Sequence, residues 1–152
     1  MKFVALLFSI PLFAALVPLD ETGFQKLVSD HKGKVVLYDF WATWCDSCRA
    51  ELPQLVRLET KLRSQGFELV TISADEPEAA ADAEKVLKQF TVRGVVYRKQ
   101  AQDDQHFIDS IDTKWSGALP ALFLYDKAGH QVQSFIGETD TAVIEAAIRK
   151  FL

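Results

Sequence analysis

The sequence predicts an α/β fold in which a central mixed β-sheet carries helices on both faces. Short apolar runs of strand length alternate with longer segments whose apolar residues recur at helical spacing. The chain closes with two strand-like segments around a turn and then a last helix, which adds an antiparallel pair to the sheet. With 152 residues, 49% hydrophobic and 25% charged, the chain suits one well-buried domain and is too short for two ordinary ones.

The N-terminus has the pattern of a secretory signal peptide. Lys2 is followed by an apolar run that ends in small residues at Ala15. Neither alanine at its end has the small residue two positions earlier that a cleavage site favours, so an uncleaved membrane anchor remains an alternative. Two prolines interrupt the run and make it marginal in length for a membrane-spanning helix. We expect a signal peptide over residues 1–15 and the folded domain over 20–152.

The first half of the domain is expected to alternate between helix and strand. Residues 22–29 place apolar side chains on one helical face, and 35–40 form a mostly apolar run that suits a buried strand. Residues 46 to about 65 have leucines at helical spacing and meet Gly66, which is typical of a helix end. Residues 67–73 are apolar enough for a second buried strand.

The second half carries shorter elements. An alanine-rich helix is expected to begin at Glu76-Pro77 and to reach about Phe90. The remaining expected elements are a strand at 95–97, a helix at 104–111, an antiparallel pair at 122–125 and 132–136, and a helix at 139–151.

The two cysteines of the chain, Cys45 and Cys48, stand in one helical turn just after the strand at 35–40. Two thiols so placed form a redox couple. At the start of a helix, unpaired backbone N–H groups and the helix dipole favour an anion, here the Cys45 thiolate. We therefore expect Cys45 to attack a disulfide and Cys48 to resolve the resulting mixed disulfide.

A zinc site and a structural disulfide are the two other uses of such a cysteine pair. A zinc site normally has four ligands, but His31, His106 and His130 are scattered without ligand spacing, so we expect no metal and no other cofactor. A purely structural disulfide suits a secreted protein, but closing so short a loop restricts the unfolded chain very little. The redox interpretation is the one that uses the helix position.

The residues around the cysteines resemble the active-site segment of thioredoxin-fold proteins. The stretch from Asp39 to Pro53, with Trp-Ala-Thr-Trp-Cys-x-x-Cys-Arg-x-Glu-Leu-Pro inside it, is most similar to the TlpA-like branch of extracytoplasmic thiol–disulfide oxidoreductases. The similarity covers residues 20–152 and includes Gly33-Lys34, the run Ala-Leu-Pro-Ala-Leu-Phe-Leu-Tyr-Asp at 118–126, Gly129 and Gly137. It implies a thioredoxin-like sandwich with an extra helix and strand inserted between Asp75 and Pro120.

The resemblance also implies roles for single residues. Pro120 matches the proline that is cis and faces the cysteine pair in this family, which leaves the backbone of Leu119 free to pair with a partner peptide. On the residues alone, Pro120 could also be a trans proline that opens a strand. Asp39 matches the buried aspartate that accepts the proton of the second cysteine; a carboxyl merely hydrogen-bonded under the active-site turn is the alternative.

Three tryptophans lie near these positions. Of Trp41 and Trp44, one is expected in the core, and Trp44 is expected to form a partly exposed platform beside Cys45 that docks partners. Trp115, just before the proline, could line the same rim or belong to the core.

The residues beside the cysteines bear on the direction of electron flow. The carboxylate of Asp46 opposes a thiolate at Cys45, whereas Arg49 one turn later favours it. We expect the pKa of Cys45 to be only moderately lowered, which makes the disulfide relatively stable and the protein a reductant.

The predicted function is that of an extracytoplasmic or periplasmic thiol–disulfide oxidoreductase that reduces disulfides in exported proteins. The resemblance adds the cysteines of apocytochrome c as a candidate substrate and a membrane thiol as electron donor. A net charge of −4 without a basic cluster argues against nucleic acid, and we expect a monomer. One alternative is a peroxidase of the related peroxiredoxin branch, although the Pro-x-x-x-Thr/Ser-x-x-Cys pattern is missing; a non-catalytic binding module is the other.

Overall fold

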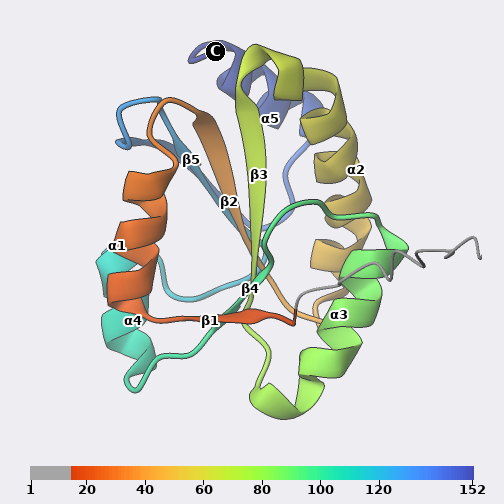
Figure 1. Ribbon diagram of the computed structural model, residues 1–152, viewed down its shortest axis with the longest axis vertical. Coiled ribbons are helices and arrows are strands. Elements are labelled where there is room, and N and C mark those ends of the chain that lie inside the picture. The colour runs from red at the N-terminus through yellow and green to blue at the C-terminus, as the bar shows by residue number, and fades with distance from the viewer. Residues whose placement is uncertain (1–14) are drawn as a thin grey trace, which may run out of the picture.

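The computed structural model describes residues 15–152, and the predicted signal peptide therefore lies outside the described residues except for Ala15. Within this range no helix is long and apolar enough to cross a membrane. Figure 1 shows a twisted central sheet with α-helices packed on both of its faces. The predicted fold class is confirmed.

Over residues 15–152 the sheet has six strands in the order β1-β4-β3-β2-β5-β6. Their bounds are β1 Val17–Leu19, β2 Val35–Trp41, β3 Phe67–Ser73, β4 Tyr97–Lys99, β5 Ala121–Tyr125 and β6 Gln131–Ile136. Strands β1 to β4 pair in parallel, whereas β5 is antiparallel to both β2 and β6. The sheet is mixed, as the sequence predicts.

In the described part of the chain, five α-helices cover the sheet, and one short 3-10 turn follows α2 while another precedes α3. The bounds of the helices are α1 Glu21–Asp30, α2 Asp46–Leu62, α3 Ala80–Gln89, α4 Asp104–Ile111 and α5 Thr141–Arg149. One face of the sheet carries α1 and α4, and the other carries α2, α3 and α5 (Figure 1).

Alternation along the central strand β2 builds both halves of the core. Tyr38 and Phe40 point toward α1 and α4, where they pack on Phe24 and other aromatic rings. Leu37 points the other way, into an aliphatic cluster with residues of α2 and α5. All seven residues of β2 are buried, so the strand is held firmly in the core and fixes the position of the loop that follows it.

Most predicted elements are confirmed. Strand β3 and helix α4 have the predicted bounds, and the predicted active-site helix is α2 plus a 3-10 turn that ends at Gly66 with a φ of 94°. The alanine-rich helix begins as a 3-10 turn, Pro77–Ala79, before α3. The inserted strand and helix between Asp75 and Pro120 are β4 and α4.

Two strand assignments need correction. Strand β1 was missed, because its three residues continue the apolar N-terminal run and gain strand character only by pairing with β4. Strand β4 was predicted at 95–97 but lies at 97–99. The apolar side chain of Val95 favoured the earlier position, yet Val95 is 51% exposed. The backbone that pairs with β1 and with the end of β3 is that of Tyr97–Lys99.

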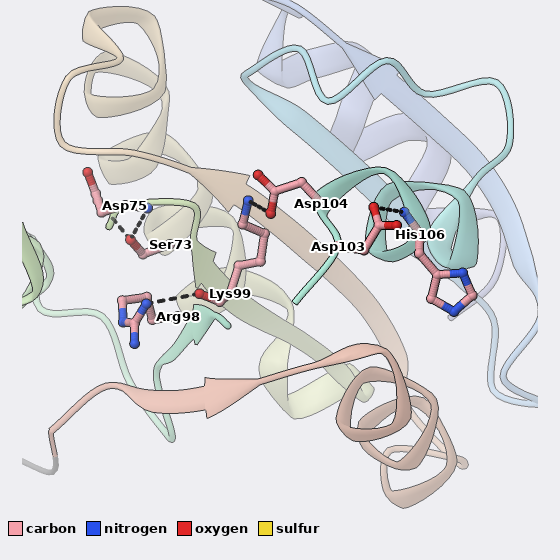
Figure 2. A network of polar contacts seen from close by, with 7 residues as sticks. All are labelled: Ser73, Asp75, Arg98, Lys99, Asp103, Asp104 and His106. Carbon is pink, nitrogen blue, oxygen red and sulfur yellow. Dashed lines mark hydrogen bonds and ion pairs between the residues drawn. The ribbon is translucent and has the colours of Figure 1, made fainter. Parts of the chain in front are cut away.

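Polar contacts join the inserted strand β4 to the inserted helix α4 (Figure 2). The Lys99 ammonium lies 2.7 Å from the Asp104 carboxylate at the start of α4. The Asp103 side chain caps α4 by accepting the backbone N–H of His106 at 3.1 Å. The backbone of β4 pairs with both β1 and β3, which places the inserted strand inside the sheet.

Candidate active site

The cysteine pair lies at the carboxyl end of β2, where α2 begins. Cys45 and Cys48 form a disulfide. Cys45 is the N-cap of α2, and its sulfur accepts the backbone N–H of Cys48 at 3.3 Å. Helix N-termini favour anions, so this position stabilises a thiolate at Cys45 once the disulfide is reduced.

Both cysteines are buried in the disulfide form, and Cys45, at 7% exposed, is slightly less covered than Cys48, at 2%. The hydroxyl of Ser47 lies 3.6 Å from the Cys45 sulfur and can hydrogen-bond to it. The attacking role of Cys45 and the resolving role of Cys48 stay predictions.

A buried carboxylate anchors the loop that leads to Cys45. Strands β2 and β3 are parallel and end opposite each other, at Trp41 and Ser73, so the residues that follow them meet. Asp75 is 2% exposed and accepts the Thr43 backbone N–H at 3.0 Å and the Thr43 hydroxyl at 2.7 Å. The Ser73 hydroxyl donates to it at 2.7 Å (Figure 2). Asp75 thereby fixes the backbone two residues before Cys45.

Replacing Asp75 with alanine is expected to lower the free energy of unfolding by about 2–4 kcal/mol, because it leaves the donors of half-buried Thr43 and buried Ser73 without an acceptor. Urea unfolding followed by tryptophan fluorescence measures the loss. The matched change at Asp82, an exposed aspartate of α3, should stay within about 0.5 kcal/mol. Equal losses in the two variants would show that the Asp75 contacts stabilise nothing.

Two carboxyl groups are buried behind the cysteines. Asp39 is 2% exposed on β2, and Glu51 is 7% exposed on α2, one turn after Cys48. Burial, and next the charge of Glu51, raise the pKa of Asp39 well above its usual value. Burial, and next the charge of Glu138, raise the pKa of Glu51 to about 7.

Glu51 is a residue that the sequence analysis did not single out as a site residue. A glutamate inside a helix normally faces solvent, and only its place directly before the inward-facing Leu52 points to burial. Its Oε1 atom has no hydrogen-bond partner among the described residues. A buried polar atom without a partner is costly and is typical of functional sites.

The proline loop reaches the same site. The Leu119–Pro120 peptide bond is cis, as the resemblance implies. Leu119 is half-buried and packs against the core cluster that contains both cysteines. The structure thus brings Pro120 and Leu119 together with Cys45 and Cys48, whereas their roles in catalysis and substrate binding stay predictions.

The three tryptophans separate clearly. Trp41 is fully buried and Trp115 is 6% exposed, with its ring on Phe40 and its Nε1–H donated to the Ala118 carbonyl at 2.9 Å. Trp115 therefore belongs to the core. Trp44 is 70% exposed directly beside Cys45 and is free to contact a partner.

No group of three or more histidine, cysteine or acidic side chains in residues 15–152 is placed to hold a metal ion.

Comparison with known proteins identifies the family. Residues 8–133 match the sequence profile of the AhpC/TSA family. The chain belongs to the AhpC/TSA family. It is 35% identical to the thiol-disulfide oxidoreductase ResA of Bacillus cereus, over 88% of this chain and 73% of the relative. Its identity to ResA of Bacillus anthracis is 32% over the same shares.

Solved structures agree with this assignment. The thioredoxin domain of a thiol-disulfide oxidoreductase from Bacteroides vulgatus is 27% identical, with a TM-score of 0.67 over 81% of this chain and 82% of that one. A thiol:disulfide interchange protein from Chlorobium tepidum, at 23% identity and a TM-score of 0.66, over 81% of this chain and 83% of that one, shares the fold. With the Cys45–Cys48 disulfide, these relatives confirm that this AhpC/TSA family member is a protein thiol–disulfide oxidoreductase of the ResA-like, TlpA-related group.

Proposed function

We propose that this AhpC/TSA family protein acts outside the cytoplasm as a reductant of disulfides in exported proteins. The observation that carries the proposal is the position of Cys45 at the N-cap of α2, with the Cys48 N–H on its sulfur. This is the geometry of an attacking thiolate with its resolving partner one turn away.

The reaction proceeds in two exchanges. The Cys45 thiolate of the reduced protein attacks one sulfur of the substrate disulfide, which forms a mixed disulfide and expels the other substrate sulfur as a thiolate. Cys48 then loses its proton and attacks Cys45, which releases the first substrate sulfur. The substrate gains two electrons and two protons overall, and the protein ends with the Cys45–Cys48 disulfide that the structure contains.

Asp39 and Glu51 are proposed to handle the proton of Cys48. Both carboxyl groups have raised pKa values, so they exchange protons closer to neutral pH than ordinary carboxyl groups do. Glu51 lies one helical turn from Cys48 and at the same time raises the pKa of Asp39. Cys48 is therefore served by two coupled groups rather than by Asp39 alone.

Trp44 and the backbone of Leu119 are proposed to bind the substrate. An exposed indole beside the reactive sulfur gives an apolar contact, and the loop at the cis bond leaves main-chain groups for an extended peptide. Together they would hold a disulfide over Cys45.

Trp44→Ala should lower kcat/KM for a protein disulfide about tenfold, because it removes an aromatic contact at the reacting sulfur. It should leave the free energy of unfolding within about 0.5 kcal/mol, since the ring is exposed. The buried counterpart Trp115→Ala should instead cost about 3–5 kcal/mol of stability. Steady-state reduction of a protein substrate, with urea unfolding of both variants, measures this; an unaltered kcat/KM at position 44 would refute the contact.

The remaining parts of the proposal concern partners and location. The substrates include the cysteines of apocytochrome c as a candidate, and a membrane thiol returns electrons to the disulfide. Residues 1–15 are proposed to direct a monomeric domain across the membrane, either as a cleaved signal peptide or as an anchor. The thioredoxin-like domain is proposed to extend over 20–152.

Insulin reduction tests the proposed activity against the peroxidase alternative. The reduced protein should reduce insulin and consume hydrogen peroxide no faster than an ordinary thiol. Equilibration with glutathione buffers tests the direction, with a potential below about −150 mV expected for a reductant. Peroxide consumption without insulin reduction would favour the peroxidase, and a potential well above that value would reverse the direction.

A further inference from the structure

Thr43 lies in the turn between the end of β2 and Cys45. The backbone N–H of Cys45 donates to the Ala42 carbonyl at 3.1 Å, which closes the turn around Thr43 and Trp44. Cys45 is then the N-cap of α2, and its sulfur accepts the Cys48 N–H. The position of this sulfur at the helix end therefore depends on the conformation of the turn.

One carboxyl group accepts the donors of this turn. Both oxygens of Asp75 accept the Thr43 backbone N–H, at 3.1 and 3.0 Å, and Oδ1 also accepts the Thr43 hydroxyl at 2.7 Å. Hydrogen bonds are directional, and these engage both the main chain and the side chain of Thr43. Asp75 therefore fixes the direction of the chain at this point as well as its position.

Asp75 is itself held in place by the last residue of β3. The Ser73 hydroxyl donates to Oδ2 of Asp75 at 2.7 Å, and the same hydroxyl oxygen accepts the Asp75 backbone N–H at 3.0 Å, as Figure 2 shows. Ser73 is fully buried and Asp75 is 2% exposed. The end of β3 thus orients the carboxyl group that orients the turn.

The turn determines the place of two groups of the candidate site. Trp44 is 70% exposed, so the backbone of the turn rather than core packing sets where its ring lies, and Cys45 follows it directly. A shift of the turn would move the indole that is proposed to contact the substrate and the sulfur that is proposed to attack it. Misplacing reacting groups by about 1 Å can cost about a hundredfold in rate.

We propose that Asp75 is a positioning residue for the disulfide exchange, which acts through Thr43 to hold Cys45 at the N-cap of α2 with Trp44 beside it. The inference rests on the proposed attack by Cys45, and it gives Asp75 control over the reactivity of that cysteine in addition to its contribution to stability. Asp75 acts by the place of its oxygens and not by its charge, so an amide oxygen at the same place should serve.

Three variants separate the position of the oxygens from their charge and from the stability of the fold. Asp75→Ala removes the acceptors of Thr43, whereas Asp75→Asn keeps an oxygen for Thr43 without the charge. Leu27→Ala opens a cavity under α1, on the face of the sheet opposite α2 (Figure 1). It should lower the midpoint of urea unfolding about as much as Asp75→Ala does, which makes it the control for lost stability.

Two measurements report on the site. One is the rate at which iodoacetamide alkylates Cys45 in the reduced protein at pH 7, followed by mass spectrometry, and the other is kcat/KM for insulin reduction. Asp75→Ala should slow the alkylation about two- to fourfold, because a looser N-cap stabilises the thiolate less. It should lower kcat/KM about ten- to a hundredfold, because Cys45 and Trp44 are misplaced together. Asp75→Asn and Leu27→Ala should keep both values close to those of the wild type.

A second pair of variants carries the test if Asp75→Ala does not fold. Thr43→Val removes only the hydroxyl bond to Asp75 and should lower both rates by a smaller factor. Thr43→Ser keeps that hydroxyl and should restore them.

Wild-type alkylation and kcat/KM in Asp75→Ala, or in Thr43→Val if that variant is used, would overturn the inference and leave the proposed function standing. Equal losses in Leu27→Ala would also overturn it, since Asp75 would then act only through stability, and equal losses in Asp75→Asn would assign the effect to the charge instead. A wild-type protein that neither reduces insulin nor reacts at Cys45 faster than an ordinary thiol would contradict the proposed function, and the inference with it.

Discussion

Cys48→Ser is expected to convert the protein into a covalent trap for its substrates. Cys45 at the N-cap of α2 still attacks, but the mixed disulfide cannot be resolved. Multiple turnover should fall by a factor on the order of a thousand or more, while stoichiometric mixed disulfides accumulate. Non-reducing electrophoresis and mass spectrometry after expression in the native compartment would detect the complexes and identify the trapped proteins.

The matched variant Cys45→Ser should lose turnover equally and trap little, because Cys48 lies inside α2 and is the more covered of the two cysteines. The assignment of roles would be contradicted if Cys45→Ser accumulated the mixed disulfides and Cys48→Ser did not.

Glu51→Gln is expected to raise stability at alkaline pH and to lower activity. The pKa of Glu51 is about 7 in the folded protein against an ordinary 4.5, so the folded state holds a proton that the unfolded state has lost between these values. The free energy of unfolding of the wild type therefore falls as the pH rises through this window, by about 2–3 kcal/mol. The variant lacks this carboxyl group and therefore this part of the fall in stability with rising pH. It should match the wild type near pH 4.5 and exceed its stability by that amount at about pH 8.

The activity of the same variant should fall about ten- to a hundredfold, with loss of the inflection near pH 7 in kcat/KM, because one of the two proposed proton-exchanging groups is gone. Glu78→Gln, an exposed glutamate on the 3-10 turn before α3, should change neither profile. Urea unfolding and kcat/KM measured between about pH 4.5 and 8 give both profiles. An unaltered pH slope of stability in Glu51→Gln would show that this carboxyl titrates normally.

Local sequence signals predicted the parts of the fold that depend on local chemistry. Strand β3 is a continuous apolar run, and Gly66 ends the active-site helix because it adopts the left-handed conformation there. Cys45 lies at the start of α2, as its place after a buried strand predicts. The short strands β1 and β4 were missed or displaced, since three-residue strands are defined by their neighbours rather than by their own pattern.

In the candidate site too, some residues could be predicted from the sequence and others could not. Cys45, Cys48, Pro120 and Asp39 follow from spacing or from family resemblance. Glu51 and the anchoring role of Asp75 do not, because each depends on residues that are distant in the sequence. Their environment exists only once α2 packs on β2 and the ends of β2 and β3 meet.

The most direct test of the account is the alkylation rate of Cys45 in the reduced Cys48→Ser variant as a function of pH, measured with iodoacetamide. A thiol at a helix N-terminus that accepts a backbone N–H should react faster at pH 7 than an ordinary free thiol, and its rate should level off at a pH below the usual thiol pKa of about 8.5. Alkylation at or below the rate of a free thiol, with an inflection at or above that pKa, would contradict the claim that the fold holds Cys45 as a reactive thiolate.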